Sequence, residues 1–383
     1  MSRPKCPTCK TQMKKNGTTT SGTTRWRCSM CNASTSLKID NRAKTMKRFL
    51  EWLLHPYPLS RLPGAGRTFR RQTAWCWDYW PAAPLCPVYT EVVHVDGIYL
   101  GRKAVVLIAA AAGQKVLAWH VARRECASSW QALLRKLQRP SIVVCDGGSG
   151  FAKACKELWP TTKIQRCTFH VFTNIRAQTT LHPRTAAGRE ILNLGRKLLT
   201  VRTENDRDEW IDQYLSWCAR YKEFLAETTR LENGQIVPTH ARLLKVRNLL
   251  NNLLAKGHIF TYLTPEAYPD GKIPKVEDLL PATNNLIEGS INSPLRELLH
   301  AHRGMSLLHR LTTICWWCYR HSYNPQDIPT ILSTIWTHDE ILKANQKAAN
   351  PTPDPDYNSL IGGPIFGTYP LYKELHHTYH YER

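Results

Sequence analysis

Hydrophobic residues in the middle of the chain follow first the period of β-strands and then that of helices. Three β-branched runs, residues 91–100, 103–111 and 115–122, are separated by turn residues and predict an antiparallel meander. A helical pattern follows at 128–140, with Ser128 or Ser129 as the predicted cap and Pro140 as the stop. The pattern then returns to a strand at 141–146, a helix at 150–160 and a short strand at 162–170.

This β-β-β-α-β-α-β order is that of a ribonuclease H-like α/β fold, in which the first and fourth strands lie side by side. Asp96 lies within the first strand and Asp146 ends the fourth, so the order predicts that the two aspartates meet at one edge of the sheet. Asp96–Gly97 and Asp146–Gly147 are also common turn dipeptides. For either aspartate taken singly, a turn is therefore the alternative.

A third carboxylate is expected on a late helix packed against the sheet, because Mg²⁺ prefers a cage of hard oxygen ligands. Residues 282–305 supply such a helix, with Glu288 beside its apolar face. That face consists of Leu286, Ile287, Ile291, Leu295, Leu298 and Leu299.

Between Asp146 and this helix lies an interval that is longer than a simple connection and is rich in helical patterns. Its aromatic residues recur every three or four positions, and we expect them to form a core rather than to stack on bases. They are Trp210, Tyr214, Trp217, Tyr221 and Phe224.

The N-terminal region holds two Cys-x-x-Cys pairs. Cys6, Cys9, Cys28 and Cys31 can form a tetrahedral zinc site, since independent buried or redox cysteines would rarely fall into this paired spacing. The polar residues between the pairs predict the hairpin of a zinc ribbon.

Residues 41–80 predict two helices joined by a turn. The second carries Arg67, Arg70 and Arg71 and is expected to be the DNA-reading helix of a helix-turn-helix, the alternative being a spacer with a solvated basic face.

Composition agrees with a polyanionic partner. The 383 residues carry a formal charge of +22, and residues 1–80 hold 16 Lys and Arg against three Asp and Glu. Such a charge suits nucleic acid, although basic surfaces also contact membranes. The start of the chain has no apolar signal stretch, and the longest apolar run, 105–113, is too short to span a bilayer. We therefore expect a soluble intracellular protein whose 13 cysteines are reduced thiols or metal ligands.

The chain resembles the Mutator-like DDE transposases of bacterial insertion sequences, in a subgroup with an N-terminal zinc ribbon. The resemblance rests on HVDGIY (94–99), VCDGGSGF (144–151), CTFH (167–170) and TNNLIEGSINSPLRELL (283–299). It implies that Asp96, Asp146 and Glu288 are the catalytic acids and that a mostly helical insertion precedes Glu288. It also makes Cys167 and His170 a family signature near the site.

The resemblance further implies phosphoryl transfer on double-stranded DNA with two Mg²⁺ (or Mn²⁺) ions held by the three acids, and one structural Zn²⁺. The expected partners are the terminal inverted repeats and target DNA, together with a second copy in a homodimer or higher homo-oligomer, and no membrane. The expected location is the bacterial cytoplasm, in association with the nucleoid. The alternatives are a catalytically silent DNA-binding regulator derived from a transposase and a ribonuclease H-like nuclease that cuts without joining.

Other residues have weaker signals. Zinc at Cys167 and His170 is disfavoured because two ligands do not make a site; His170 is expected to contact a carboxylate or a DNA phosphate. His94 is expected to be a core or rim histidine, and Cys315 and Cys318 to pack in an apolar helix. The residues expected to face DNA are Arg25, Arg27, Arg67, Arg70, Arg71, Arg296 and Arg303.

The predicted organisation runs in seven segments. They are a zinc ribbon (1–40), a helix-turn-helix (41–80), a linker (81–87), the first part of the core (88–170), the helical insertion (171–281), the last part of the core with the Glu288 helix (282–322) and a C-terminal helix and tail (323–383).

Overall fold

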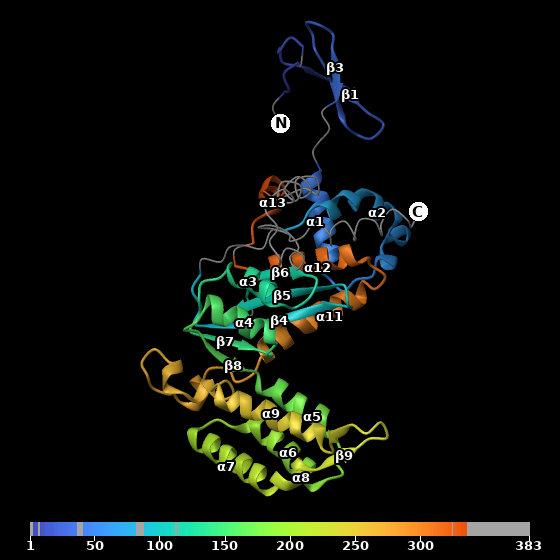
Figure 1. Cartoon of the computed structure of the whole chain (residues 1–383). Coiled ribbons are helices and arrows are strands. Elements are labelled where there is room, and N and C mark those ends of the chain that lie inside the picture. Colours follow the sequence, from blue (N-terminus) through green and yellow to red (C-terminus); the bar gives the residue numbers. More distant parts are fainter. Residues whose placement is uncertain are drawn as a thin grey trace, which may run out of the picture.

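The computed structural model describes residues 3–6, 8–36, 41–81, 88–111, 113, 115–323 and 325–334. It is a mixed α/β structure built around one five-stranded sheet. Figure 1 shows this sheet in the middle of the molecule, a small three-stranded sheet at one end and a group of helices at the other. Most of the predicted linker (82–87) and most of the predicted tail (335–383) lie outside the described residues.

The central sheet has the strand order β6-β5-β4-β7-β8. Its strands are β4 (Val92–Leu100), β5 (Ala104–Ala111), β6 (Val116–Ala122), β7 (Ile142–Cys145) and β8 (Lys163–Arg166). β4, β5 and β6 pair antiparallel, so the predicted meander is confirmed. β4 and β7, the first and fourth predicted strands, are parallel neighbours, and β8 pairs parallel with β7.

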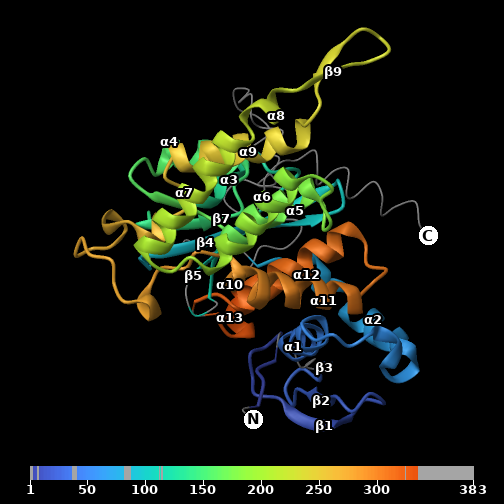
Figure 2. The ribbon, with the colours of Figure 1, turned by 90° about the horizontal axis from the view of Figure 1, so that it is seen from below.

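Helices cover both faces of this sheet. α3 (Ala127–Leu134) and α4 (Ser149–Leu158) pack on one face around the buried Trp130 and Phe151. α11 (Ser293–Ala301) and α12 (Leu307–Arg320) pack on the other, where Cys315 and Cys318 are fully buried, as predicted. Figure 2 shows the two pairs of helices on opposite sides of the strands.

The predicted cap of α3 is wrong. The helix begins at Ala127 with Cys126 at its N-cap position, so Ser128 and Ser129 lie inside the first turn and are buried. The Ser129 hydroxyl donates a hydrogen bond to the Arg124 carbonyl oxygen (3.0 Å) instead of capping. The helix also ends at Leu134, before the predicted stop.

Asp96 lies inside strand β4 and not in a turn. Asp96 pairs with Ile108 of β5, and Gly97 pairs with Leu107, so the turn alternative for this dipeptide is wrong. Side chains alternate between the faces of a strand, and Ile98, two residues after Asp96, belongs to the core under α11 and α12. Asp96 therefore faces the late helices.

The late helix is interrupted where the sequence predicts a continuous one. A short helix α10 (Asn285–Ile287) leads into a π-helical segment, Glu288–Asn292, before α11 begins. Pro294 explains the interruption, because it has no N–H to donate to the carbonyl of Ser290 and its ring crowds that carbonyl. Single π-helical turns often occur at functional sites, and Glu288 opens this one.

The interval between β8 and α10 forms a helical bundle with its own core. Its helices are α5 (Thr168–Thr179), α6 (Ala186–Lys197), α7 (Glu204–Arg220), α8 (Lys222–Ala226) and α9 (Ala241–Ala255), with a hairpin of β9 (Thr228–Arg230) and β10 (Ile236–Pro238). Trp210, Tyr214 and Trp217 are buried, and Tyr221 and Phe224 pack against them. The predicted core role of these aromatics is confirmed.

The N-terminal region has two parts. β1 (Lys14–Thr18), β2 (Thr24–Arg27) and β3 (Ser34–Ser36) form the small antiparallel sheet, which contains the predicted hairpin. α1 (Arg42–Leu53) and α2 (Arg67–Thr73) follow, joined by two 3₁₀ turns, and a third turn, Ala74–Asp78, comes after α2. α1 buries Phe49 in a cluster with Trp316 of α12 and Ile331 of α13 (Ile328–Thr334). Within the described ranges, no helix is both long and apolar enough to cross a bilayer.

Asn284 ties the start of the late helix to the sheet and to the helical bundle. Its fully buried side chain donates to the Val95 carbonyl oxygen (2.9 Å) and pairs with His94 Nδ1 (3.0 Å). Its backbone N–H donates to Cys167 Sγ (3.1 Å). This one residue therefore fixes where Glu288 lies relative to β4.

We expect Asn284→Ala to lower the free energy of unfolding by about 2–3 kcal/mol, because it leaves buried polar groups of β4 without partners. The neighbouring Asn285 is exposed, so Asn285→Ala is a matched control that should stay within about 0.5 kcal/mol of the wild type. Urea unfolding of both variants checks this. An equal decrease in the free energy of unfolding in the two variants would contradict the proposal that Asn284 holds the late helix against β4.

Candidate active site

The three predicted acids come from three separate elements. Asp96 lies in the middle of β4, Asp146 follows the last residue of β7, and Glu288 begins the π-helical segment. The parallel register pairs Val92 with Ile142 and His94 with Val144. Continued by two residues, this register brings Asp146 beside Asp96.

The electrostatics of Asp96 link the three carboxylates. Asp96 is only 8% exposed, and burial is the main cause that raises its pKa to about 8. The backbone N–H of Gly97 donates to Asp96 Oδ1 (2.8 Å) and opposes this shift. The negative charges of Glu288 and Asp146 raise the pKa further. A cation at this place would relieve the repulsion and favour the ionised carboxylate.

Glu288 is held between two cationic or titratable side chains. Its Oε1 lies 3.6 Å from Nε2 of His170, on α5, and its Oε2 lies 3.4 Å from Nη1 of Arg296, on α11. The distance to His170 is that of an ion pair rather than of a hydrogen bond. Of the two predicted partners of His170, the structure thus provides a carboxylate. Arg296, which the sequence assigns to DNA, lies at the acid site itself.

Cys167 connects His170 to the start of the late helix. It is buried at the N-cap of α5 and accepts the hydrogen bond from the Asn284 backbone N–H. Burial raises the pKa of the Cys167 thiol, but hydrogen bonds with His170 and Asn284 lower it overall. The same contact with Cys167 is the main cause that raises the pKa of His170. The signature pair therefore positions α5, α10 and Glu288 relative to one another.

His94 is a core histidine, as predicted. It is 1% exposed, it pairs with Asn284, and burial lowers its pKa. It lies on the same strand face as Asp96 but serves the packing of the late helix.

Two residues near the acids were not predicted. Asn292, buried at the end of the π-helical segment, donates from Nδ2 to Asp96 Oδ2 (2.5 Å). Within the described residues, no hydrogen-bond partner is found for its buried Oδ1. Its position four residues after Glu288 is the signal that could have revealed it, since residues so spaced share a helix face.

Glu125 is the second. A Cβ at Gly97 would collide with Glu125 Oε1, and one at Gly148 would lie 3.5 Å from Oε2. The carboxylate thus lies against the backbone beside both aspartates, on the α3–α4 side of the sheet. Burial and the charge of Asp146 raise the pKa of Glu125. Glu125 lies in the connection between β6 and α3 and belongs to no sequence motif, so no pattern in the sequence could have revealed it.

The carboxylate oxygens of Asp96, Asp146 and Glu288 are ligands of the type that Mg²⁺ and Mn²⁺ prefer. The raised pKa of Asp96 agrees with a cation site between the late helix and the sheet. So does Asn292 Oδ1, for which no partner is found among the described residues. The carboxylate oxygens of Asp96, Asp146 and Glu288 do not all lie within 4.8 Å of one another. In the described part of the chain, only Cys6, Cys9, Cys28 and Cys31 form a group of His, Cys, Asp or Glu whose ligand atoms all lie within 4.8 Å of one another.

The four cysteines fit a tetrahedral metal ion. Their Sγ atoms lie 3.5 Å apart for Cys6 and Cys31, 3.3 Å for Cys9 and Cys28, and 3.6 Å for Cys9 and Cys31. Zinc–sulfur bonds of about 2.3 Å in a tetrahedron place the sulfurs about 3.8 Å apart. The spacing of the Cys-x-x-Cys pairs thus correctly predicts a candidate metal site at the base of the small sheet.

The predicted DNA-facing arginines are spread over several elements. Arg25 and Arg27 are exposed on β2, and Arg67, Arg70 and Arg71 are exposed on α2. Arg303 is exposed just after α11. Three cations that the sequence reading missed, Arg102, Lys103 and Arg123, line one cavity together with Arg70 and Arg303.

Comparison with known proteins relates the central part of the chain to transposases. Residues 85–243 match the family model described as "Transposase, Mutator family", a match that contains both aspartates, Cys167 and His170 but ends before Glu288. A "Transposase for insertion sequence element IS6120" from Mycolicibacterium smegmatis is 44% identical over 78 residues, which cover 18% of this chain and 24% of the relative. A "Transposase for insertion sequence element IS905" from Lactococcus lactis is 32% identical over 103 residues, 23% of this chain and 26% of the relative.

The chain thus spans about a quarter of the length of each of these curated relatives. The matched segment holds the sheet, the two aspartates and the Cys167–His170 pair, which are the parts from which the site is built. The central segment of the chain, residues 85–243, is thus similar to the Mutator family of transposases.

Proposed function

We propose that this protein is a DNA transposase that binds the terminal inverted repeats of its insertion sequence and catalyses metal-dependent DNA cleavage and strand transfer. The observation that carries the proposal is geometric: the register of β4 beside β7 brings Asp146 next to Asp96, and Asn292 of the Glu288 segment donates to Asp96 from the late helix. The strand order, with β4 beside β7, supports a ribonuclease H-like core. The family of the central segment supports DNA as the substrate.

In this proposal Asp96, Asp146 and Glu288 hold two Mg²⁺ or Mn²⁺ ions. The ions would supply an activated oxygen nucleophile and charge neutralisation at the leaving 3′-oxygen. The acids act as ligands and not as proton carriers, and β4 keeps Asp96 rigid. Asn292 orients Asp96 through its hydrogen bond, and His170 orients Glu288.

Arg296 has a second role in the proposal. Its guanidinium now lies beside Glu288, and it is exposed on α11. A DNA phosphate entering the site offers it a new anionic partner, so that Glu288 becomes available as a ligand. A guanidinium suits this exchange because it binds carboxylate and phosphate with the same fork of donors.

The N-terminal region supplies DNA recognition. The four-cysteine group is proposed to bind one structural Zn²⁺, and α1 and α2 to form the helix-turn-helix, with Arg67, Arg70 and Arg71 towards DNA. Strand transfer joins two element ends to a target, so we propose at least a homodimer. For a protein that acts on DNA, we propose a location in the cytoplasm, at the nucleoid.

Replacing each acid by its amide removes a charged ligand with little change in volume. We expect Asp96→Asn, Asp146→Asn and Glu288→Gln each to reduce cleavage and joining of duplexes that carry the element ends by orders of magnitude, while DNA binding persists. Glu297→Gln, at an exposed position of α11, is the control and should keep wild-type activity. A wild-type protein that binds but never cuts would be a regulator, and one that cuts but never joins would be a nuclease; either result overturns the proposal.

The raised pKa of Asp96 predicts a pH-dependent stability. Because its folded pKa is about 8 and its unfolded pKa about 3.9, the native state binds the extra proton between these values, and stability falls as pH rises from about 4 to about 8. Asp96→Asn should flatten this fall, most clearly between about pH 6 and 8. Urea midpoints measured without added divalent metal test this, with Glu297→Gln as the control that keeps the wild-type slope. Identical slopes in wild type and Asp96→Asn would show that Asp96 is not buried as described.

The cysteine group predicts one zinc per chain. Cys28→Ser should abolish bound zinc and weaken DNA binding, because so small a segment depends on its metal to fold. Cys218→Ser, on α7, should keep the metal. Elemental analysis of the purified proteins checks both, and a metal-free wild type would refute the zinc ribbon.

A further inference from the structure

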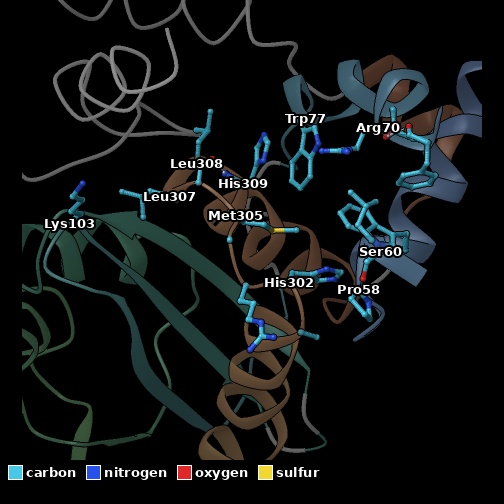
Figure 3. A pocket seen from close by; sticks show the side chains of 18 of the residues that line it. Pro58, Ser60, Arg70, Trp77, Lys103, His302, Met305, Leu307, Leu308 and His309 are labelled. Atoms are coloured by element: carbon cyan, nitrogen blue, oxygen red, sulfur yellow. Dashed lines mark hydrogen bonds between the residues drawn. The ribbon is translucent and has the colours of Figure 1, made fainter. Parts of the chain in front are cut away.

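A basic cavity of about 1140 Å³ lies between the N-terminal helices α1 and α2 and the core that carries the acids. One wall comes from α1, α2 and the turns beside them. The other comes from residues 301–309, which comprise the end of α11, the connection to α12 and the first turn of α12. Arg102 and Lys103, in the turn between β4 and β5, and Arg123, after β6, complete it. Figure 3 shows Lys103 on one side, Arg70 on the other and the 302–309 segment between them. We call this cavity the basic groove.

The charge of the basic groove has one sign. Among the described residues that line it, five are Lys or Arg, namely Arg70, Arg102, Lys103, Arg123 and Arg303, and none is Asp or Glu. Its volume is above that of most small-molecule pockets, and five cationic side chains line it beside its apolar residues. Charge complementarity therefore favours a polyanion as the occupant.

The aromatic residues of the basic groove are already used to hold its walls together. Trp77 stacks on His309 with ring centroids 3.7 Å apart, and Trp52 packs edge-on against His302 (4.8 Å). His302 Nε2 also pairs with the Leu53 carbonyl oxygen of α1 (3.1 Å). Burial lowers the pKa of His309 to about 4, so this ring adds no charge. Single-stranded DNA is bound largely on free aromatic faces, whereas a duplex backbone is bound mainly by Lys and Arg, and the basic groove has the second character.

The basic groove lies at a defined distance from the acids. α11 starts just after the Glu288 segment and ends just before Arg303. Fifteen residues at the α-helical rise of 1.5 Å per residue span at most about 22 Å, and a duplex that rises about 3.4 Å per base pair covers this in about six base pairs. Arg296 lies between the two along the same helix.

We propose that the basic groove binds the sugar-phosphate backbone of the element end about six base pairs from the scissile bond. This inference rests on the proposed function for the identity of the DNA, and on the charge and position of the groove for the contact. Because its cations come from both the DNA-binding helices and the core, the contact would fix the distance between the recognised sequence and the cut.

The test compares two double variants of the full-length protein in binding to a short mixed-sequence duplex over a series of KCl concentrations. Each lost phosphate contact lowers the slope of log K against log salt by about 0.9, so Arg102→Ala/Lys103→Ala should lower it by about 1.8 and weaken binding. Lys153→Ala/Lys156→Ala removes two exposed charges from α4, on the opposite face of the sheet, and should leave the slope unchanged. If the two double variants behave alike, the basic groove is not a DNA contact.

Competition with the single strand of the same sequence tests the choice of duplex, since a single strand that competes better than the duplex would overturn it. Binding is measured without divalent metal, so the result does not depend on catalysis. If the wild type cuts and joins DNA but Arg102→Ala/Lys103→Ala leaves the salt slope unchanged, DNA binding by the basic groove is refuted and the catalytic proposal is not. If Arg102→Ala/Lys103→Ala lowers the salt slope but the wild type cannot cut DNA, the catalytic proposal is refuted and DNA binding by the basic groove is not.

Discussion

The arrangement of the site depends on one constraint, the burial of the Asp96 carboxylate in the middle of the sheet, which costs free energy unless its neighbours compensate. Asp96 is 8% exposed, and burial together with the charges of Glu288 and Asp146 raises its pKa. A lone buried carboxylate would destabilise the fold, so its neighbours compensate: the Gly97 N–H and the Asn292 amide donate to it. These contacts do not cancel the repulsion by Glu288 and Asp146, which disfavours the ionised form of Asp96. A divalent cation is the group that turns this repulsion into attraction, which is why a strained site and a catalytic site coincide in our proposal.

The second requirement is to hold Glu288, which is distant in sequence, next to β4. Asn284 does this from a fully buried position, through Val95, His94 and Cys167. The π-helical segment that follows turns Glu288 and Asn292 towards the sheet, and Pro294 fixes where the segment ends. The signature residues Cys167 and His170 thus gain a physical role: they join the helical bundle to the late helix and support Glu288 from the side.

Much of the fold could be predicted from the sequence because it is encoded locally. The β-branched runs predict the meander, and the paired cysteines predict the four-sulfur group. What could not be predicted arises from contacts between distant segments. Asn284, Asn292 and Glu125 have no motif of their own, and their importance appears only when β4, the late helix and the β6–α3 connection meet. Similarly, Arg102, Lys103 and Arg123 are ordinary surface cations along the chain, and only the cavity brings them together with Arg70 and Arg303. The cap of α3 was missed because Cys126, a poor capping residue, stands where the helix starts.

The claim that three distant segments hold one metal centre can be measured directly, without reference to activity. With Fe²⁺ in place of Mg²⁺, ascorbate and peroxide generate hydroxyl radicals at the bound ion, which cut the backbone next to its ligands. We expect cuts near Asp96, Asp146 and Glu288 in the same protein, and we expect Asp96→Asn to suppress all three together. Cuts confined to one or two of these segments, or a cut at Glu288 that survives Asp96→Asn, would contradict a shared centre.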